Sequence, residues 1–217
     1  MEILLPFLLV ILASFFQGSF GLGMKYMEPL KWEAWWIIHV TVAMIIFPIL
    51  WAVFAVPNLF QVISNAPTEA VFLGMLFGFL WGVGGILFGK SVPYIGLSLT
   101  YGVVMGLAAS VGSIIPLMQV EDAFSNPATT YVIIAVVIML VGVAITAKAG
   151  IDRDKLIGDT KNPSNMIKGI LIAVSCGVLS ALLNVGFANA TPVALEAEKM
   201  GAITRNSSLA AWVVVLL

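Results

Sequence analysis

Charged residues, cysteine and histidine are scarce in this chain of 217 residues. Only 10% of the residues are charged, whereas about 25% are charged in soluble domains, and 61% are hydrophobic. A soluble core of this size could not bury so much apolar surface, so the composition indicates an integral membrane protein. The single cysteine excludes an intrachain disulfide and a multi-cysteine zinc site. A net charge of −1 gives no general attraction to nucleic acid, so we expect no nucleic-acid partner.

The hydrophobic residues fall into runs long enough to cross a lipid bilayer, which takes about 20 residues in a helix. We expect six complete spans, at residues 4–24, 34–56, 68–89, 96–118, 130–149 and 167–190. A partial seventh begins near Ser207 and stops at Leu217. The sequence therefore predicts an all-α, polytopic helix bundle that forms a single transmembrane domain over residues 1–217. We also expect the chain to be a C-terminally truncated piece of a longer protein.

Lysine and arginine are distributed unevenly between the two sides of these predicted spans. Eight lie on one side, namely Lys25, Lys31, Lys90, Lys148, Arg153, Lys155, Lys161 and Lys168. Only Lys199 and Arg205 lie on the other side. Because cytoplasmic loops carry an excess of these residues, the first side is predicted to be cytoplasmic and the N-terminus periplasmic.

Carboxylates are absent from the middle of every predicted span, since all eleven acidic residues fall in loops or at span ends. This distribution argues against a proton relay of carboxylates and against a cation channel lined by an acidic ring. The sequence also shows no catalytic triad, metal-ligand cluster or phosphate-binding loop. We therefore expect no enzymatic activity, no metal and no cofactor.

Glycine is abundant, and it recurs every four residues in the third and fourth predicted spans. Small residues at this spacing let helices pack closely in lipid, and we expect these two spans to form a close antiparallel hairpin. The glycines assigned to helix packing are Gly74, Gly78, Gly82, Gly85, Gly89, Gly102 and Gly106. A second interpretation is that the adjacent Gly84 and Gly85 allow the helix to bend during transport.

The polar side chains that remain within the spans are mostly neutral hydrogen-bonding groups, which suit an uncharged polyol better than an ion. Gln17 and Asn184 place bulky amides near mid-span, and Trp81 is suited to stacking on a sugar ring. With Tyr101 they form the candidate substrate-binding set. The alternative role of each polar group is a helix–helix hydrogen bond, which contributes about 0.6 kcal/mol.

Two ionisable residues near the start of the second span are candidates for proton coupling. His39 lies about six residues into the span, and an imidazole titrates near neutral pH. The alternative for His39 is an interfacial position beside the tryptophans of the stretch "KWEAWW" (31–36). Glu33, in the same stretch, has the alternative role of stabilising the helix N-terminus.

A weak internal repeat relates the first and sixth predicted spans. Ser14 and Ser19 in the first span are matched at one offset by Ser175 and Ser180 in the sixth. Since the sixth span starts five spans after the first, the second copy would be inverted in the membrane. We therefore expect residues 1–150 to be a first five-helix repeat. Residues 167–217 would begin a second, truncated repeat in a 5+5 plan of ten helices.

Three stretches, "KWEAWW", "LFGFLWGVGGILFGKSVPYIGLSLTYGV" and "KGILIAVSCGVLSALLN", resemble the L-rhamnose–proton symporter family of the drug/metabolite transporter superfamily. The resemblance covers most of the chain. It implies ten helices in two inverted repeats and secondary active uptake of a deoxy-sugar, expected to be L-rhamnose, by proton symport across the bacterial inner membrane. The implied partners are the sugar, protons and the lipid bilayer.

Two other functions stay open from the residues alone. One is a carrier or exporter of another small metabolite within the same superfamily. The other is a membrane subunit that transports nothing and uses its glycines only for assembly.

Overall fold

The computed structural model describes residues 4–27, 29–120, 122–156 and 163–217, and these residues form helices and turns without a strand. The chain divides into two compact units, Met1–Val42 and Ala43–Leu217. Each unit is described by itself below.

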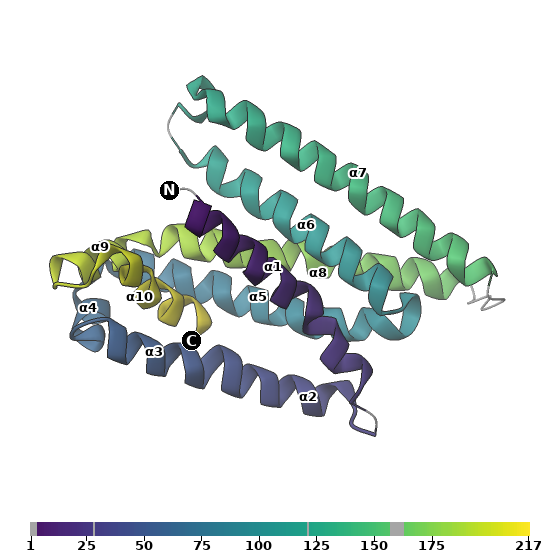
Figure 1. The fold of residues 1–217 in the computed structure, drawn as a ribbon, viewed down its shortest axis with the longest axis horizontal. Helices are drawn as coiled ribbons and strands as arrows, with labels where there is room; N and C mark the ends of the chain where they lie inside the picture. Colours follow the sequence, from purple (N-terminus) through teal and green to yellow (C-terminus); the bar gives the residue numbers. More distant parts are fainter. Residues whose placement is uncertain (1–3, 28, 121, 157–162) are drawn as a thin grey trace. The chain divides into compact units, whose positions relative to one another are not determined.

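The first unit contains α1 (Leu4–Lys25) and α2 (Trp32–His39), which are drawn in Figure 1. Both helices are rich in apolar residues. A π-helix, η1 (Val40–Ile46), follows α2 and leads into α3 (Phe47–Ala55). Pro48 stands at the start of α3 and has no amide hydrogen to donate to the carbonyl four residues earlier. The regular α-helical pattern is therefore interrupted next to this proline, where the wider π-helix is found.

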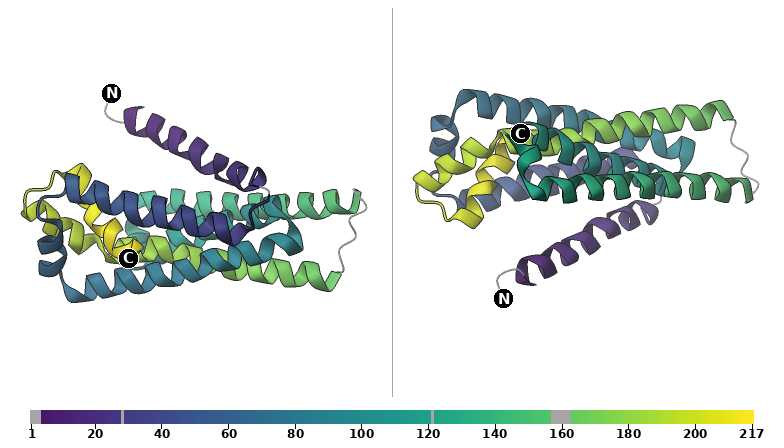
Figure 2. Two further views of the ribbon diagram at one scale, coloured as in Figure 1. Left: turned by 90° about the horizontal axis from the view of Figure 1, so that it is seen from below. Right: turned by 90° about the horizontal axis from the view of Figure 1, so that it is seen from above.

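The second unit continues from α3 with seven further α-helices and one short 3₁₀ helix among the described residues. They are α4 (Leu59–Asn65), α5 (Thr68–Ile95), α6 (Leu97–Met118), η2 (Ala123–Ser125), α7 (Pro127–Leu156), α8 (Pro163–Asn189), α9 (Thr191–Lys199) and α10 (Thr204–Leu216). Helix α8 packs against both α5 and α6, and α7 packs against α6 (Figures 1 and 2). Helix α10 packs against α3, α5 and α9.

Five helical stretches of the described residues are long and apolar enough to cross a membrane, by length and composition. They are Trp32–Ala55, Thr68–Ile95, Leu97–Met118, Pro127–Arg153 and Asn165–Lys199. These stretches confirm the all-α membrane fold and match five of the six predicted complete spans. The predicted span 4–24 corresponds to α1, of which the stretch Leu4–Ser19 is an apolar helix among the described residues. The predicted partial seventh span corresponds to α10.

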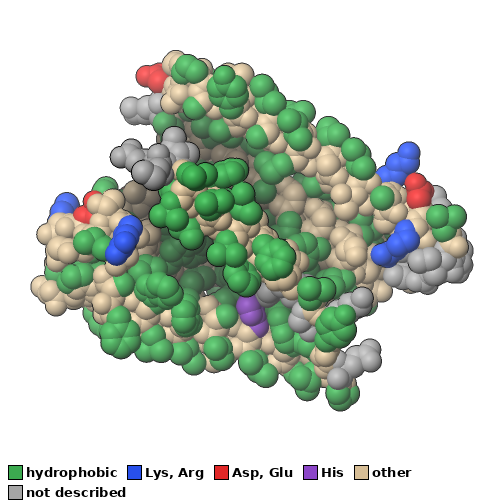
Figure 3. Space-filling view, in the orientation of Figure 1, with side chains coloured by type: hydrophobic (Ala, Val, Ile, Leu, Met, Phe, Trp, Pro, Cys, Tyr) green, Lys and Arg blue, Asp and Glu red, His purple; other side chains and the backbone are tan. Residues whose placement is uncertain are grey.

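Hydrophobic side chains cover much of the visible surface, and the coloured Lys, Arg, Asp and Glu side chains lie toward the ends of the helices (Figure 3). On α7, Ile138 and Ile145 are 66% and 63% exposed. A surface of this kind is compatible with lipid and not with water.

Helix α8 comes close to its two neighbours at glycines. A Cβ built on Gly177 would lie 2.7 Å from the Cβ of Leu107 in α6. On the other side, a Cβ on Gly84 of α5 would lie 3.1 Å from the Cβ of Leu179 in α8. Close backbone approach of this kind is how helices associate in lipid, where the hydrophobic effect between helices is weak.

The predicted packing glycines have different neighbours from those we expected. Gly74 and Gly78 face Val214 and Val215 of α10, and Gly102 and Gly106 face α7. Apart from its own stretch of helix, no heavy atom lies within 4 Å of a Cβ built on Gly82, so this residue makes no close contact with another helix in the described chain.

Helices α5 and α6 are joined by a tight turn at Gly96, whose φ of +78° is accessible to glycine without strain. Next to the turn, the buried hydroxyls of Ser91 and Thr100 lie 2.9 Å apart and link the two helices. Both helices nevertheless pack more extensively against α8 than against each other, which differs from the predicted close hairpin.

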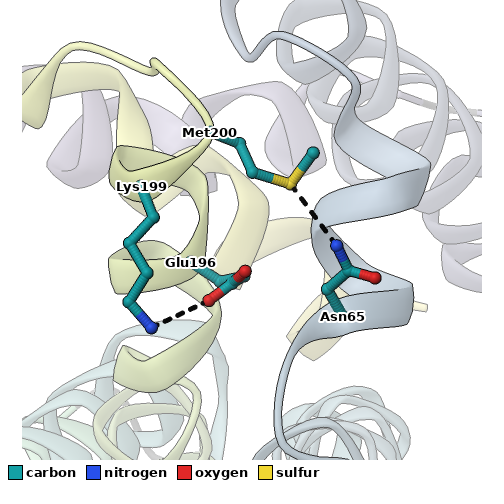
Figure 4. Close-up of polar contacts among 4 residues, drawn as sticks. All are labelled: Asn65, Glu196, Lys199 and Met200. Carbon is teal, nitrogen blue, oxygen red and sulfur yellow. Dashed lines mark hydrogen bonds and ion pairs between the residues drawn. The ribbon is translucent and has the colours of Figure 1, made fainter.

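A buried apolar cluster holds the other end of the second unit together, where α3, α4, α9 and α10 meet. Val56, Val62 and Val193 are at most 1% exposed there. Polar contacts lie near the cluster (Figure 4): Lys199 Nζ donates to Glu196 Oε2 over 2.9 Å, and Asn65 Nδ2 lies 3.9 Å from Met200 Sδ. The first contact lies within α9, and the second connects α4 to the end of α9.

Candidate functional site

Asn184 lies where α8 meets α6, and its amide rests against Gly112. A Cβ built on Gly112 would lie 3.2 Å from Cγ of Asn184 and 3.3 Å from the carbonyl oxygen of Ala181. Gly112 is buried, whereas Asn184 keeps an exposed side. The amide therefore packs against the α6 backbone, while the residue keeps exposed surface.

Trp81 lies on the face of α5 that packs against α8, at nearly the same height along the bundle as Asn184. Phe77 contacts Gly186 of α8, and Gly84 contacts the middle of α8. Trp81 stands four residues after Phe77 and three before Gly84, so all three share one face. Because α5 and α8 run in opposite directions, these contacts place Trp81 opposite the turn of α8 that carries Asn184.

Tyr101 lies at a different height. It precedes Gly112 by eleven residues in α6, which corresponds to about 16 Å along the helix axis. Its ring packs edge-to-face against Phe88, with the ring centroids 6.0 Å apart. Trp81 and Asn184 of the candidate set therefore lie at one level of the facing helices α5 and α8, whereas Tyr101 lies at another level.

Asn184 also belongs to a line of polar groups along α8 that includes Cys176 and Ser180 at intervals of four residues. The buried Cys176 thiol donates a hydrogen bond to the carbonyl oxygen of Gly84 over 3.1 Å, and its sulfur lies 3.8 Å from Ser180 Oγ. Sequence reasoning did not assign roles to Cys176 or Gly112. The four-residue spacing was a signal for Cys176, but nothing in the sequence distinguished Gly112 from other glycines.

The three remaining candidates belong to the first unit. Gln17 is exposed on α1, and Glu33 is exposed in the first turn of α2. His39 ends α2 and is stacked parallel to Trp35, with ring centroids 5.0 Å apart, and lies 5.6 Å from Trp36. His39 thus lies beside the tryptophans of residues 31–36, and both its proton-coupling role and its interfacial alternative stay predictions.

A shallow groove of about 370 Å³ lies elsewhere between α5 and α8, lined mainly by Leu87, Ile167, Leu171 and Ile172. Lys168 also lines it and holds its ammonium 5.1 Å from the centre of the Tyr94 ring. None of the candidate sugar-binding residues lines this groove. Within the described ranges, no group of three His, Cys, Asp or Glu residues is arranged to hold a metal ion.

Comparison with known proteins identifies the family. The sequence model described as L-rhamnose-proton symport protein (RhaT) matches residues 2–217, almost the entire chain. The chain belongs to this family. The resemblance inferred from the sequence stretches is thus confirmed.

The curated relatives of this family member carry the same description. The chain is 30% identical over 202 residues to an L-rhamnose-proton symporter of Mannheimia succiniciproducens. The aligned residues are 92% of this chain and 59% of that protein. It is 26% identical over 195 residues to an L-rhamnose-proton symporter of Yersinia pestis, and these residues are 88% of this chain and 57% of that protein. The chain thus spans about three fifths of the length of these relatives. No solved structure matches it.

Proposed function

We propose that the protein is a secondary active transporter that takes up a small neutral sugar, L-rhamnose, by proton symport across the bacterial inner membrane. The observation that carries this proposal is the family match over residues 2–217. The neutral polar groups within the spans, and the carboxylates confined to loops and span ends, support an uncharged substrate.

The proposal extends to the architecture. Ten helices would form two inverted five-helix repeats, with residues 1–150 in the first and the second beginning at residue 167. The N-terminus would be periplasmic, which the Lys and Arg distribution supports. The greater length of the relatives supports the second repeat.

The sugar site would include Trp81 and Asn184, which lie at about the same level along α5 and α8. An indole stacks on the apolar face of a sugar ring, and an amide both donates to and accepts from hydroxyls. Gln17 of the first unit stays a separate candidate for a sugar contact, and Tyr101 would contact sugar at another depth along α6. His39 or Glu33 would bind the proton, and symport requires that this protonation change sugar affinity.

Uptake of labelled L-rhamnose into proteoliposomes tests the function, with protein made from the complete natural gene. We expect accumulation when the lumen is alkaline relative to the outside, and its loss when a protonophore collapses the gradient. Absence of uptake for any sugar would contradict transport. Uptake that is insensitive to the protonophore would contradict symport only.

Two substitutions test the site in the same assay. Trp81→Ala and Asn184→Ala should each raise KM about tenfold, since each removes a contact to bound sugar. Phe79→Ala serves as the control, because Phe79 is on the same helix as Trp81 and 70% exposed. Unchanged kinetics in both site variants would remove them from the sugar site.

A further inference from the structure

We propose that Gly112 is a positioning residue of the sugar site. Because Gly112 has no side chain, the Asn184 amide has the space to take the orientation that binds sugar. This inference rests on the proposed function. It adds a residue of α6 that itself needs no contact with the substrate.

The first argument is the space around Gly112. The position of a Cβ there is already occupied by the Asn184 amide, whose Cγ lies 3.2 Å from it and whose Nδ2 lies closer still. The carbonyl oxygen of Ala181 lies 3.3 Å from the same position. Because that carbonyl belongs to the backbone, the side chain of Asn184 is the group that must move when a methyl group is added.

The second argument is a contrast with the other glycine of this interface. Gly177 of α8 faces Leu107 and the carbonyl oxygen of Val104, so its role is close packing between helices. Gly112 instead faces a polar, partly exposed side chain. A methyl group at residue 112 therefore redirects a hydrogen-bonding group, whereas one at residue 177 only separates two helices.

The third argument is the position of the pair. Gly112 lies at the level of α8 that faces Trp81, the other residue proposed to contact sugar. An amide displaced there would no longer meet the sugar in the same orientation, and a small misplacement of a positioned group can cost much of its effect.

A double-mutant cycle in the uptake assay tests this inference, with Gly112→Ala, Asn184→Ala and the double variant. Gly112→Ala should raise KM at least fivefold in the wild-type background and leave it unchanged in the Asn184→Ala background. Gly177→Ala is the matched control. Thermal unfolding in detergent should show similar losses of stability for Gly112→Ala and Gly177→Ala, while only Gly112→Ala changes KM.

The outcomes separate the two proposals. An equal rise in KM from Gly112→Ala in both backgrounds would show a packing role and overturn this inference while transport stands. A normal KM in Asn184→Ala would also overturn it, since there would be no sugar contact to position. Lack of uptake by the wild-type protein would instead refute the proposed function.

Discussion

Cys176 shows how a single residue acquires a role from its neighbours. As the only cysteine it could be assigned no disulfide, and by composition it was simply a small apolar residue. In the folded chain the residue is 1% exposed, and its thiol donates to the Gly84 carbonyl of another helix. The residue thus links α8 to α5 at a point where Gly84 allows the backbones to approach.

Enlarging the Cys176 side chain should disrupt its contact with the backbone of Gly84. Cys176→Leu should lower the free energy of unfolding by about 1–3 kcal/mol, because the extra methyl groups have no space between α5 and α8. Unfolding in detergent micelles measures the change. Cys176→Ser, of similar size and still a donor, is the control and should cost less than about 1.5 kcal/mol. Equal stability of the two variants would contradict the tight packing seen at this position.

His39 is the residue for which the proton-coupling proposal is most directly testable. His39→Phe preserves a ring for stacking on Trp35 but removes the titratable group. If His39 carries the coupled proton, as proposed, this variant should lose concentrative uptake yet still exchange labelled for unlabelled sugar. Exchange assays with and without a pH gradient measure this. Normal accumulation would restrict His39 to the aromatic stack and leave Glu33 as the proton-binding candidate.

Helix α5 shows how one element with regularly spaced glycines presents different surfaces along its length. Gly78 lies directly against the backbone of Val215 in α10, with the Val215 Cα 3.3 Å from a Cβ built on the glycine. Gly82, one turn later, has open space around it. Regular spacing therefore predicted a packing surface but not which glycines are in contact.

Substituting alanine at these two glycines should have opposite effects on stability. Gly78→Ala should destabilise the protein by about 1–3 kcal/mol, since the backbone of α10 cannot move aside easily. Gly82→Ala should be neutral or should stabilise α5 by up to about 1 kcal/mol, because alanine is the better helix former. Thermal unfolding in detergent compares them. Similar destabilisation by both would contradict the contact assigned to Gly78.

At the scale of the whole molecule, the described helices and the charge distribution together predict how the chain crosses the membrane. Helix α7 has 30 residues, about 45 Å, which is sufficient to cross the hydrocarbon core with its ends in water. Phe124, just before α7, is 74% exposed, and Leu156 at its end is 89% exposed. These two positions should lie on opposite sides of the bilayer.

Labelling of introduced cysteines tests this arrangement, in a Cys176→Ser background. A membrane-impermeant maleimide added to intact spheroplasts should label Phe124→Cys, and it should label Leu156→Cys only after permeabilisation. The reverse pattern would contradict the proposed periplasmic N-terminus. Labelling of both positions from outside would contradict a spanning α7.

Much of the helix arrangement along the chain was predictable, and much of the candidate site was not. The predicted span 96–118 corresponds closely to α6 (Leu97–Met118), because a long apolar run between a glycine and polar residues is a local signal. The common level of Trp81 and Asn184 was not predictable. It depends on the register between α5 and α8, which are separated by about a hundred residues.

The amino-acid sequence by itself determined that the protein belongs in a membrane, where most of its helices lie, and which family it resembles, because hydropathy and sequence motifs are properties of consecutive residues. Only the tertiary structure decided that α8 packs against both α5 and α6, that Gly78 contacts α10, and that Gly112 supports Asn184. The physical reason is that a glycine permits close approach without specifying the partner. The partner is selected by the shapes of whole helix faces, which are assembled from distant parts of the chain.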